Sequence, residues 1–236
     1  LLVAFGFYYQ RLQHQFARQQ LLNRLRALSA QMNPHFISNS LNAIEAMISA
    51  NRNREASNYL VQFAHLSRMV MGSSQSDMTC LADEIDLLKK YLKLEQMRME
   101  PQMRFQIQVE EQIEPFDIYL PPMMIQPFVE NAIWHGIKPK KGQGKIVVQF
   151  LLKNENEICC IIEDDGIGRE QAQRLKMASA HPQLSYSTRI IEERLKVLES
   201  QLGADLEIKD LKDDRGLPIG TRVEISFSIK KNHEFQ

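Results

Sequence analysis

The sequence predicts an all-helical N-terminal region followed by an α+β domain, and two observations carry this prediction. In the first hundred residues, apolar side chains recur every three or four positions, which is the period of an amphipathic helix. From Met103 onward, apolar and polar residues alternate in short stretches, as in half-buried strands, and helical stretches lie between them. The change of pattern predicts a boundary near Pro101, with a helical region at 10–100 and a second domain at 101–236.

The composition limits the possible classes of function. A chain of 236 residues, 44% of them hydrophobic, is long enough for two domains with cores of their own. Lysine plus arginine and aspartate plus glutamate each number 29, so no strongly basic surface for nucleic acid is expected. The cysteines Cys80, Cys159 and Cys160 form neither a zinc-binding spacing nor a disulfide framework, which favours a reducing, cytoplasmic setting.

The first nine residues, LLVAFGFYY, are uncharged and end in two tyrosines, with Arg11 shortly after. Nine residues cannot span a bilayer, and the charged start of a signal peptide is missing. Interfacial tyrosines followed by a basic residue are typical of the end of a transmembrane helix. We therefore interpret residues 1–9 as the end of such a segment, cut from a longer membrane protein, with a free hydrophobic terminus as the alternative.

The helical region is expected to contain a long helix, a turn and two further helices. Apolar residues at helical spacing run through residues 12–48, and the polar break Asn51-Arg52-Asn53 suits a hairpin turn. A second helix has its apolar face within 60–70, and a third spans Leu81–Met99 and stops before Pro101. Two antiparallel helices per chain would form a four-helix bundle in a dimer.

The stretch Gln31–Asn42 interrupts this pattern with chemically distinctive residues. Pro34 lacks a backbone donor and clashes with the preceding turn, which predicts a kink at this point. His35 follows the kink, and Asn39 lies one turn further on the same face. A largely neutral imidazole is nucleophilic, so His35 is a candidate reactive group. The alternative is an ordinary helix whose histidine makes a core contact.

The second domain is expected to run strand, helix, two strands, helix, two strands. The expected bounds are, in that order, Met103–Val109, Met123–His135, Lys145–Leu152, Glu157–Glu163, Arg189–Leu202, Leu206–Ile208 and Thr221–Ile229. Residues 153–156 suit an antiparallel turn, and Gly203 suits the end of the second helix.

One polar cluster lies on the predicted helix at 123–135. Asn131 and His135 are one turn apart and share a face with Gln126, and Glu130 falls beside that face. An asparagine carbonyl oxygen is a ligand that Mg²⁺ takes together with phosphates and waters. A polar surface stripe is the alternative, but a Glu-Asn pair among apolar residues is poorly explained by exposure alone.

A second cluster follows the strand at 157–163. Asp164 ends a hydrophobic run, and Gly166 and Gly168 come directly after it. The glycines allow the backbone to approach a ligand closely, and a carboxylate can accept a hydrogen bond from an exocyclic amine such as that of adenine. A lone Gly-x-Gly is weak evidence of a site, and the pairing with the Glu-Asn helix makes the pattern specific.

Together these clusters resemble the N-box and the first glycine box of the ATP-binding fold shared by histidine kinases and gyrase-type ATPases. The stretch QMNPHFISNSLN resembles the phosphoacceptor box of the autolysin-sensor (NPHF-box) subfamily of sensor histidine kinases. Its linking segment is similar to Leu81–Arg98 at Leu81, Glu84, Tyr91, Glu95 and Arg98. The resemblance implies a helical dimerisation and phosphoacceptor hairpin followed by an α/β-sandwich ATP-binding domain. A gyrase-like ATPase without histidine transfer would leave the NPHF stretch unexplained.

The resemblance also implies a role for each matching residue. His35 would accept the phosphoryl group from ATP, Glu130 would act near the γ-phosphate, and Asn131 would hold Mg²⁺. Asp164 would bind the adenine amine, and Asn39 would orient His35 or a hydrolytic water. The other nucleotide-contacting residues would be His135, Gly166, Gly168, Ser185, Ser187, Gly220 and Thr221. The implied partners are a second copy of the chain and a cytoplasmic response regulator, and the implied location is the cell membrane, with this part facing the cytoplasm.

Several residues depart from the family pattern. Ser185 and Ser187 occupy the two glycine positions of the second glycine box, where backbone amides normally approach the phosphates. Trp134 replaces a polar or basic residue, Asp165 replaces an asparagine, and Phe36 stands where other subfamilies have an acidic residue after the histidine. These departures keep a second hypothesis open, a dimeric signalling partner that binds nucleotide poorly and acts through its helices.

Overall fold

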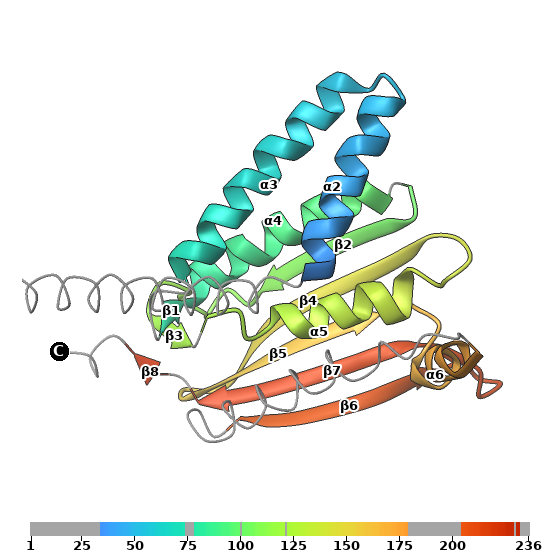
Figure 1. Cartoon of the computed structure of the whole chain (residues 1–236). Helices are drawn as coiled ribbons and strands as arrows, with labels where there is room; N and C mark the ends of the chain where they lie inside the picture. The colour runs from blue at the N-terminus through green and yellow to red at the C-terminus, as the bar shows by residue number, and fades with distance from the viewer. Residues whose placement is uncertain are drawn as a thin grey trace, which may run out of the picture. The chain divides into compact units, whose positions relative to one another are not determined.

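The computed structural model describes residues 34–73, 78–99, 101–120, 122–178, 204–228 and 230–231 (Figure 1). The chain divides into two compact units, Leu1–Gln75 and Ser76–Gln236. The described part of the first unit is helical, and the second is a mixed α/β domain, so the predicted order of fold classes is confirmed.

The first unit contains a helical hairpin. Helices α2 (Pro34–Ser49) and α3 (Asn53–Ser73) are joined by a tight turn in which Asn51 has a φ of 58°. Asparagine tolerates this left-handed conformation, so the polar break at 51–53 is a turn, as predicted. The aromatic rings of Phe36 and Phe63 lie 5.9 Å apart between the two helices. The hairpin therefore has an apolar contact directly after His35 in the sequence.

The helix predicted to lead into this hairpin lies outside the described residues, as do residues 1–9. The described helix α2 begins at Pro34, a position in a first helical turn where proline is tolerated. The kink at Pro34 therefore stays a prediction. No helix within the described ranges is both long enough and apolar enough to span a membrane.

The second unit is built on a five-stranded sheet in the order β2-β4-β5-β7-β6. The strands are β2 (Met103–Val109), β4 (Gly144–Asn154), β5 (Glu157–Asp164), β6 (Asp205–Lys212) and β7 (Pro218–Ser228). β2 and β4 are parallel, and the other neighbours are antiparallel. A second, small sheet pairs β1 (Thr79–Cys80) with β3 (Ile118–Leu120), and β3 with β8 (Lys230–Lys231).

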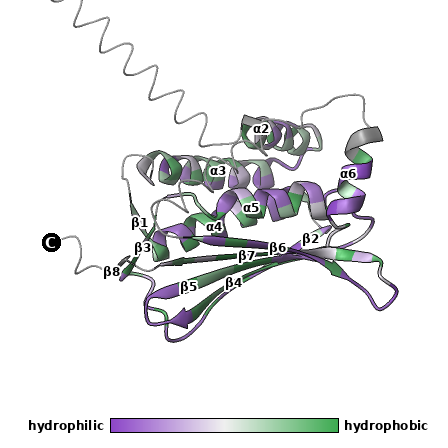
Figure 2. Cartoon of the chain, turned by 90° about the horizontal axis from the view of Figure 1, so that it is seen from below, coloured by the Kyte–Doolittle hydropathy of each residue, from purple (hydrophilic) through white to green (hydrophobic). Residues whose placement is uncertain are grey.

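Helices cover one face of the large sheet. Figure 2 shows α4 (Leu81–Met99) and α5 (Gln126–Asn131) on the same side of the strands. The alternate residues Ile146, Val148 and Phe150 of β4 are fully buried, and the register places Ile162 and Asp164 of β5 on the same face. Burial of this face creates the domain's core, and Asp164 is a polar residue at its edge.

The division of the chain lies 25 residues before the predicted boundary at Pro101, because unit two starts at Ser76. Helix α4 belongs to this unit, since the Glu84 carboxylate accepts hydrogen bonds from the backbone N–H groups of Met123 (2.9 Å) and Ile125 (3.3 Å). The change in sequence pattern marks the first strand of the large sheet, whereas the compact unit begins with a helix that packs against it.

The predicted helix at 123–135 is observed with different bounds. Met123 has a φ of 59°, a left-handed conformation that excludes it from a right-handed helix, and α5 begins at Gln126. The chain continues as the π-helix η1 (Ala132–Ile137). Helix α6 (Arg169–Ala178) and the short strands β1 and β3 were not predicted. The predicted helix Arg189–Leu202 lies outside the described residues.

Candidate functional site

The helix that carries Glu130 and Asn131 continues at its C-terminal end as the π-helix η1, whose turns are wider. In η1 the N–H of Lys138 donates to the carbonyl of Ile133 at 2.8 Å, the five-residue spacing of a π-helix. Such wide turns are costly, and they are frequent at functional sites. The wide turn brings Gly136 against the loop after β5, where its carbonyl accepts a hydrogen bond from Ile167 N–H at 3.2 Å. The two predicted clusters therefore meet through their backbones.

Asp164 lies at this meeting point. Its side chain is buried, with 4% of the residue exposed, and its Oδ1 accepts the N–H of Gly166 at 2.9 Å. In the sheet, Asp164 pairs with Ile146 on one side and with Thr221 on the other. The carboxylate is thus fixed by the central strand β5 and by the turn that follows it.

Three glycines make room for Asp164. A Cβ on Gly136 would overlap its carboxylate, a Cβ on Gly166 would overlap Gly136 and the same carboxylate, and a Cβ on Gly220 would overlap its backbone carbonyl. Gly220 also has a φ of 152°, which side chains rarely adopt. The glycines let three backbone segments approach one acidic group closely.

Burial raises the pKa of Asp164 from 3.8 to about 7. The Gly166 N–H lowers this pKa, the neighbouring Asp165 raises it, and Lys140 and the backbone of Thr221 lower it. Near neutral pH the group therefore changes charge readily. An ionised Asp164 can accept a hydrogen bond from an amine, whereas a protonated one can donate its own proton.

Asp165 and Lys140 hold the loop beside Asp164. The Asp165 Oδ1 accepts the N–H of Lys145 at 2.7 Å and lies 3.0 Å from the Lys140 Nζ. Lys140 also donates to the Asp165 carbonyl at 2.6 Å. The aspartate that stands in place of the family's usual asparagine therefore has a structural partner of opposite charge.

Glu130 and Asn131 lie at the C-terminal end of α5. The Glu130 Oε1 accepts a hydrogen bond from the buried Gln126 Nε2 at 2.9 Å, one helical turn earlier. Asn131 and His135 are both half-buried, Asn131 as the last residue of α5 and His135 within η1. The helix thus carries the predicted metal-binding amide next to a carboxylate whose rotamer is fixed by a side-chain hydrogen bond.

The other predicted site residues lie in several parts of the chain. Gly168 (φ 75°) starts the turn into α6, and Gly220-Thr221 lie in β7 beside Asp164. Ser185 and Ser187 lie outside the described residues. His35 is in the first turn of α2, and Asn39 is half-buried one turn later, both in the first unit. Gly136 was not predicted to be a site residue, although a glycine within a helical pattern destabilises the helix and so points to a packing or functional reason.

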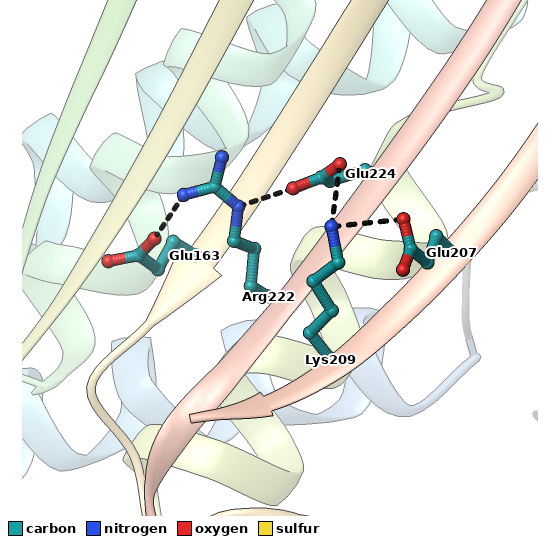
Figure 3. Close-up of polar contacts among 5 residues, drawn as sticks. All are labelled: Glu163, Glu207, Lys209, Arg222 and Glu224. Carbon is teal, nitrogen blue, oxygen red and sulfur yellow. Dashed lines mark hydrogen bonds and ion pairs between the residues drawn. The ribbon is translucent and has the colours of Figure 1, made fainter. Parts of the chain in front are cut away.

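A chain of ion pairs crosses the opposite face of the sheet near its Asp164 end (Figure 3). Arg222 of β7 lies 3.2 Å from Glu163 of β5 and 2.6 Å from Glu224. Lys209 of β6 lies 3.2 Å from Glu224 and 2.9 Å from Glu207. The two pairs that cross between strands, Arg222–Glu163 and Lys209–Glu224, support the register of β5, β7 and β6. That register places Thr221 beside Asp164.

Within the described parts of the chain, no group of three or more histidine, cysteine, aspartate or glutamate side chains could hold a metal ion. A magnesium ion at Asn131 would therefore need oxygen ligands from a bound nucleotide and water, which is the usual coordination of Mg²⁺ at phosphate sites.

Known proteins are similar to this chain over much of its length. Residues 23–103 match the family model described as Histidine kinase. An uncharacterised protein, YwpD of Bacillus subtilis, is 29% identical over 182 residues, which cover 76% of this chain and 64% of that protein. The sensor histidine kinase/phosphatase LytS of Staphylococcus aureus is 31% identical over 144 residues, covering 61% of this chain and 24% of LytS.

The chain thus matches less than two thirds of the length of YwpD and about a quarter of LytS. Among solved structures, the histidine kinase domain of the blue-light activated histidine kinase from Erythrobacter litoralis has a TM-score of 0.48 and 14% identity, covering 89% of this chain and 95% of that chain. The family match and the LytS relatives therefore make this chain similar to sensor histidine kinases of the LytS type.

Proposed function

We propose that the chain uses ATP to phosphorylate His35 and then passes the phosphoryl group to an aspartate of a response regulator. The observation that carries the proposal is the buried Asp164, enclosed by the backbones of Gly136, Gly166 and Gly220 and joined through η1 to Glu130 and Asn131. An acidic acceptor at one end and a Glu-Asn pair at the other match the two ends of an adenine nucleotide.

Each residue has a proposed task in this reaction. Asp164 accepts a hydrogen bond from the adenine amine, and Gly166, Gly168, Gly220 and Thr221 form the walls beside it. Bound Mg²⁺, held by Asn131 and the phosphates, supplies charge neutralisation when ATP is present.

Glu130, fixed by Gln126, orients groups near the γ-phosphate. His135 is proposed to contact the phosphates from η1, and Ser185 and Ser187 from the segment that replaces the second glycine box. Phosphoryl transfer needs mainly positioning and electrostatic support, so these tasks need little covalent chemistry from the protein.

His35 supplies the nucleophile, because a neutral imidazole nitrogen can attack the γ-phosphorus while the bond to ADP breaks. Asn39, one turn later on α2, is proposed to orient His35 or a water that hydrolyses the phosphoryl group. The complete protein is proposed to act as a homodimer at the cell membrane. Its helical region would form the dimer interface.

The decisive experiment is incubation with γ-labelled ATP and Mg²⁺, comparing the parent chain with His35→Gln and Asn131→Ala. We expect acid-labile, alkali-stable label in the parent and none in either variant. Binding of ATP is measured in parallel by calorimetry. A parent that binds ATP without becoming labelled would contradict the kinase and favour the second candidate, a signalling partner that acts through its helices.

A further inference from the structure

Trp134 is the only tryptophan of the chain, and it lies on η1 three residues after Asn131. Two cations approach its ring. The guanidinium carbon of Arg98 is 5.0 Å from the ring centroid, and the Lys138 Nζ is 3.8 Å from it. A cation over the face of an indole ring is attracted by the negative charge of the ring's π-system. The segment that carries Asn131 is therefore bound to α4 through Arg98.

Arg98 is itself fixed on α4. It forms an ion pair with Glu95, whose side chain is fully buried, and only 15% of the Arg98 side chain is exposed. Tyr91, one turn before Glu95, is also fully buried. Burial and the nearby charges of Glu130 and Glu95 raise the pKa of Tyr91, and Arg98 and Trp134 oppose this rise. One face of α4 thus contacts Trp134 and lies close enough to Glu130 for its charge to act on Tyr91.

Glu84 lies in the first turn of α4, at the opposite end from Arg98. It is 2% exposed and accepts the backbone N–H groups of Met123 and Ile125, directly before α5 begins. Helix α5 has no side-chain cap of its own at its N-terminus. Glu84 and Arg98 are about 21 Å apart along α4 at 1.5 Å per residue. Helix α4 therefore holds the Glu130–Asn131 helix near both of its ends.

We propose that Arg98 is a positioning residue, which acts through Trp134 to set the placement of Glu130 and Asn131 relative to the phosphates of bound ATP. The inference rests on the proposed function. Arg98 contacts η1 at Trp134, whereas the base-binding end at Asp164 takes only Gly136 from η1 and its other walls from Gly166 and Gly220. Loss of Arg98 should therefore slow phosphoryl transfer and leave the affinity for ATP nearly unchanged.

The test compares Arg98→Ala, Arg98→Lys and the control Lys89→Ala, which removes a cation from an exposed position of the same helix. For each variant, the rate of His35 labelling, the KM for ATP and the fluorescence of Trp134 are measured. In Arg98→Ala we expect the labelling rate to fall about 10- to 100-fold, the effect of a small misplacement of reacting groups, with KM changed less than about threefold. Arg98→Lys should recover part of the rate, because it keeps the charge but loses the planar contact with the indole.

The emission of Trp134 should shift in Arg98→Ala and stay unchanged in Lys89→Ala. An equal loss of rate in Lys89→Ala, a change in KM as large as the change in rate, or an unchanged emission in Arg98→Ala would overturn the inference. If the parent is not labelled at all, the proposed function fails, and the fluorescence decides the inference alone. An emission change on adding Mg²⁺ and ATP that Arg98→Ala abolishes would then support it, and the absence of that change would overturn it.

Discussion

The two ends of the candidate site are built by different means. Around Asp164 the walls are backbone, from Gly136, Gly166 and Gly220, and a Cβ added to any of these glycines would overlap Asp164. At Glu130 and Trp134 the contacts are side chains with charge, including Arg98 and Lys138, whose geometry can relax. The first end is sensitive to volume and the second to charge. Substitutions that change one property at a time can separate these two kinds of construction.

The largest effect is expected from Gly220→Ala. The new Cβ would overlap the Asp164 carbonyl at a φ of 152°, so strand β7 must move away from β5. We expect a loss of about 3 kcal/mol or more in the free energy of unfolding, measured by urea denaturation, and no detectable ATP binding.

The matched control is Gly216→Ala, where φ is also positive (77°) but no atom lies within 4 Å of the added Cβ. This variant should lose only about 1–2 kcal/mol, the cost of the left-handed backbone alone, and should keep its ATP affinity. Equal losses in the two variants would show that the crowding around Asp164 contributes nothing to stability.

The next effect concerns the charge of Asp164, whose pKa is about 7. The ionised carboxylate accepts a stronger hydrogen bond from the adenine amine than the protonated group does, so ATP affinity should rise with pH between about 6 and 8. Asp164→Asn should weaken binding about 10- to 100-fold at pH 8, the value of a charged hydrogen bond, and should remove the pH dependence. Calorimetry at about pH 6 and pH 8 measures the ATP affinity of parent and variant. An identical pH profile in the variant would contradict the role of Asp164.

The same pKa has an opposite consequence for stability. The folded state holds the Asp164 proton more tightly than the unfolded state, whose pKa is near 3.8, so the free energy of unfolding falls as pH rises from about 4 to about 7. In Asp164→Asn the free energy of unfolding does not fall in this way, because the asparagine side chain does not titrate. Its thermal midpoint relative to the parent should therefore be higher at pH 8 than at pH 5, and a gap independent of pH would contradict the raised pKa.

Local patterns predict the elements well where one periodicity is uninterrupted. The helix Leu81–Met99 and the strand Met103–Val109 are observed with the expected bounds. The surroundings of Asp164 could not be predicted, because Gly136 and Gly220 reach it from other segments through a π-helix and a strand register. The sequence marked Asp164 as an acceptor, but burial and its raised pKa depend on which residues fold over it.

Trp134 and Glu84 illustrate the same limit at the other end of the site. Trp134 is a departure from the family pattern, and only the fold brings Arg98 and Lys138 to its ring. Glu84 is one of two acidic residues in the first turn of α4, where exposed carboxylates favour the helix dipole. The structure instead buries it against Met123 and Ile125. Contacts between elements decide both roles.

A smaller effect is expected from Glu84→Gln. The carboxylate uses both of its oxygens to accept the N–H groups of Met123 and Ile125, whereas the amide has only one acceptor oxygen. The amide N–H groups would face these backbone donors. Removing a charged acceptor from two buried donors should cost about 1–3 kcal/mol in urea denaturation. Asp86→Asn, at an exposed position of the same helix, is the control and should cost under about 0.5 kcal/mol. Equal costs would show that Glu84 does not hold the start of α5.

The smallest effect is expected from Arg169→Ala, which touches neither end of the site. Arg169 forms two hydrogen bonds to Asp210, at 2.7 and 2.8 Å, and joins the start of α6 to β6. Both side chains are more than a third exposed, so the loss should stay below about 1 kcal/mol, with ATP affinity unchanged.

Arg169 lowers the pKa of Asp210, so the pair stabilises the fold at neutral pH and loses this contribution as acid protonates Asp210. Arg174→Ala, which breaks a more exposed pair with Glu170 on the same helix, is the matched control. A difference between the two variants at pH 7 that persists at pH 2, or in 1 M salt, would mean that Arg169 acts through packing rather than through its charge. In that case side-chain volume would matter near Gly168 too, although less than at the backbone-lined end at Asp164.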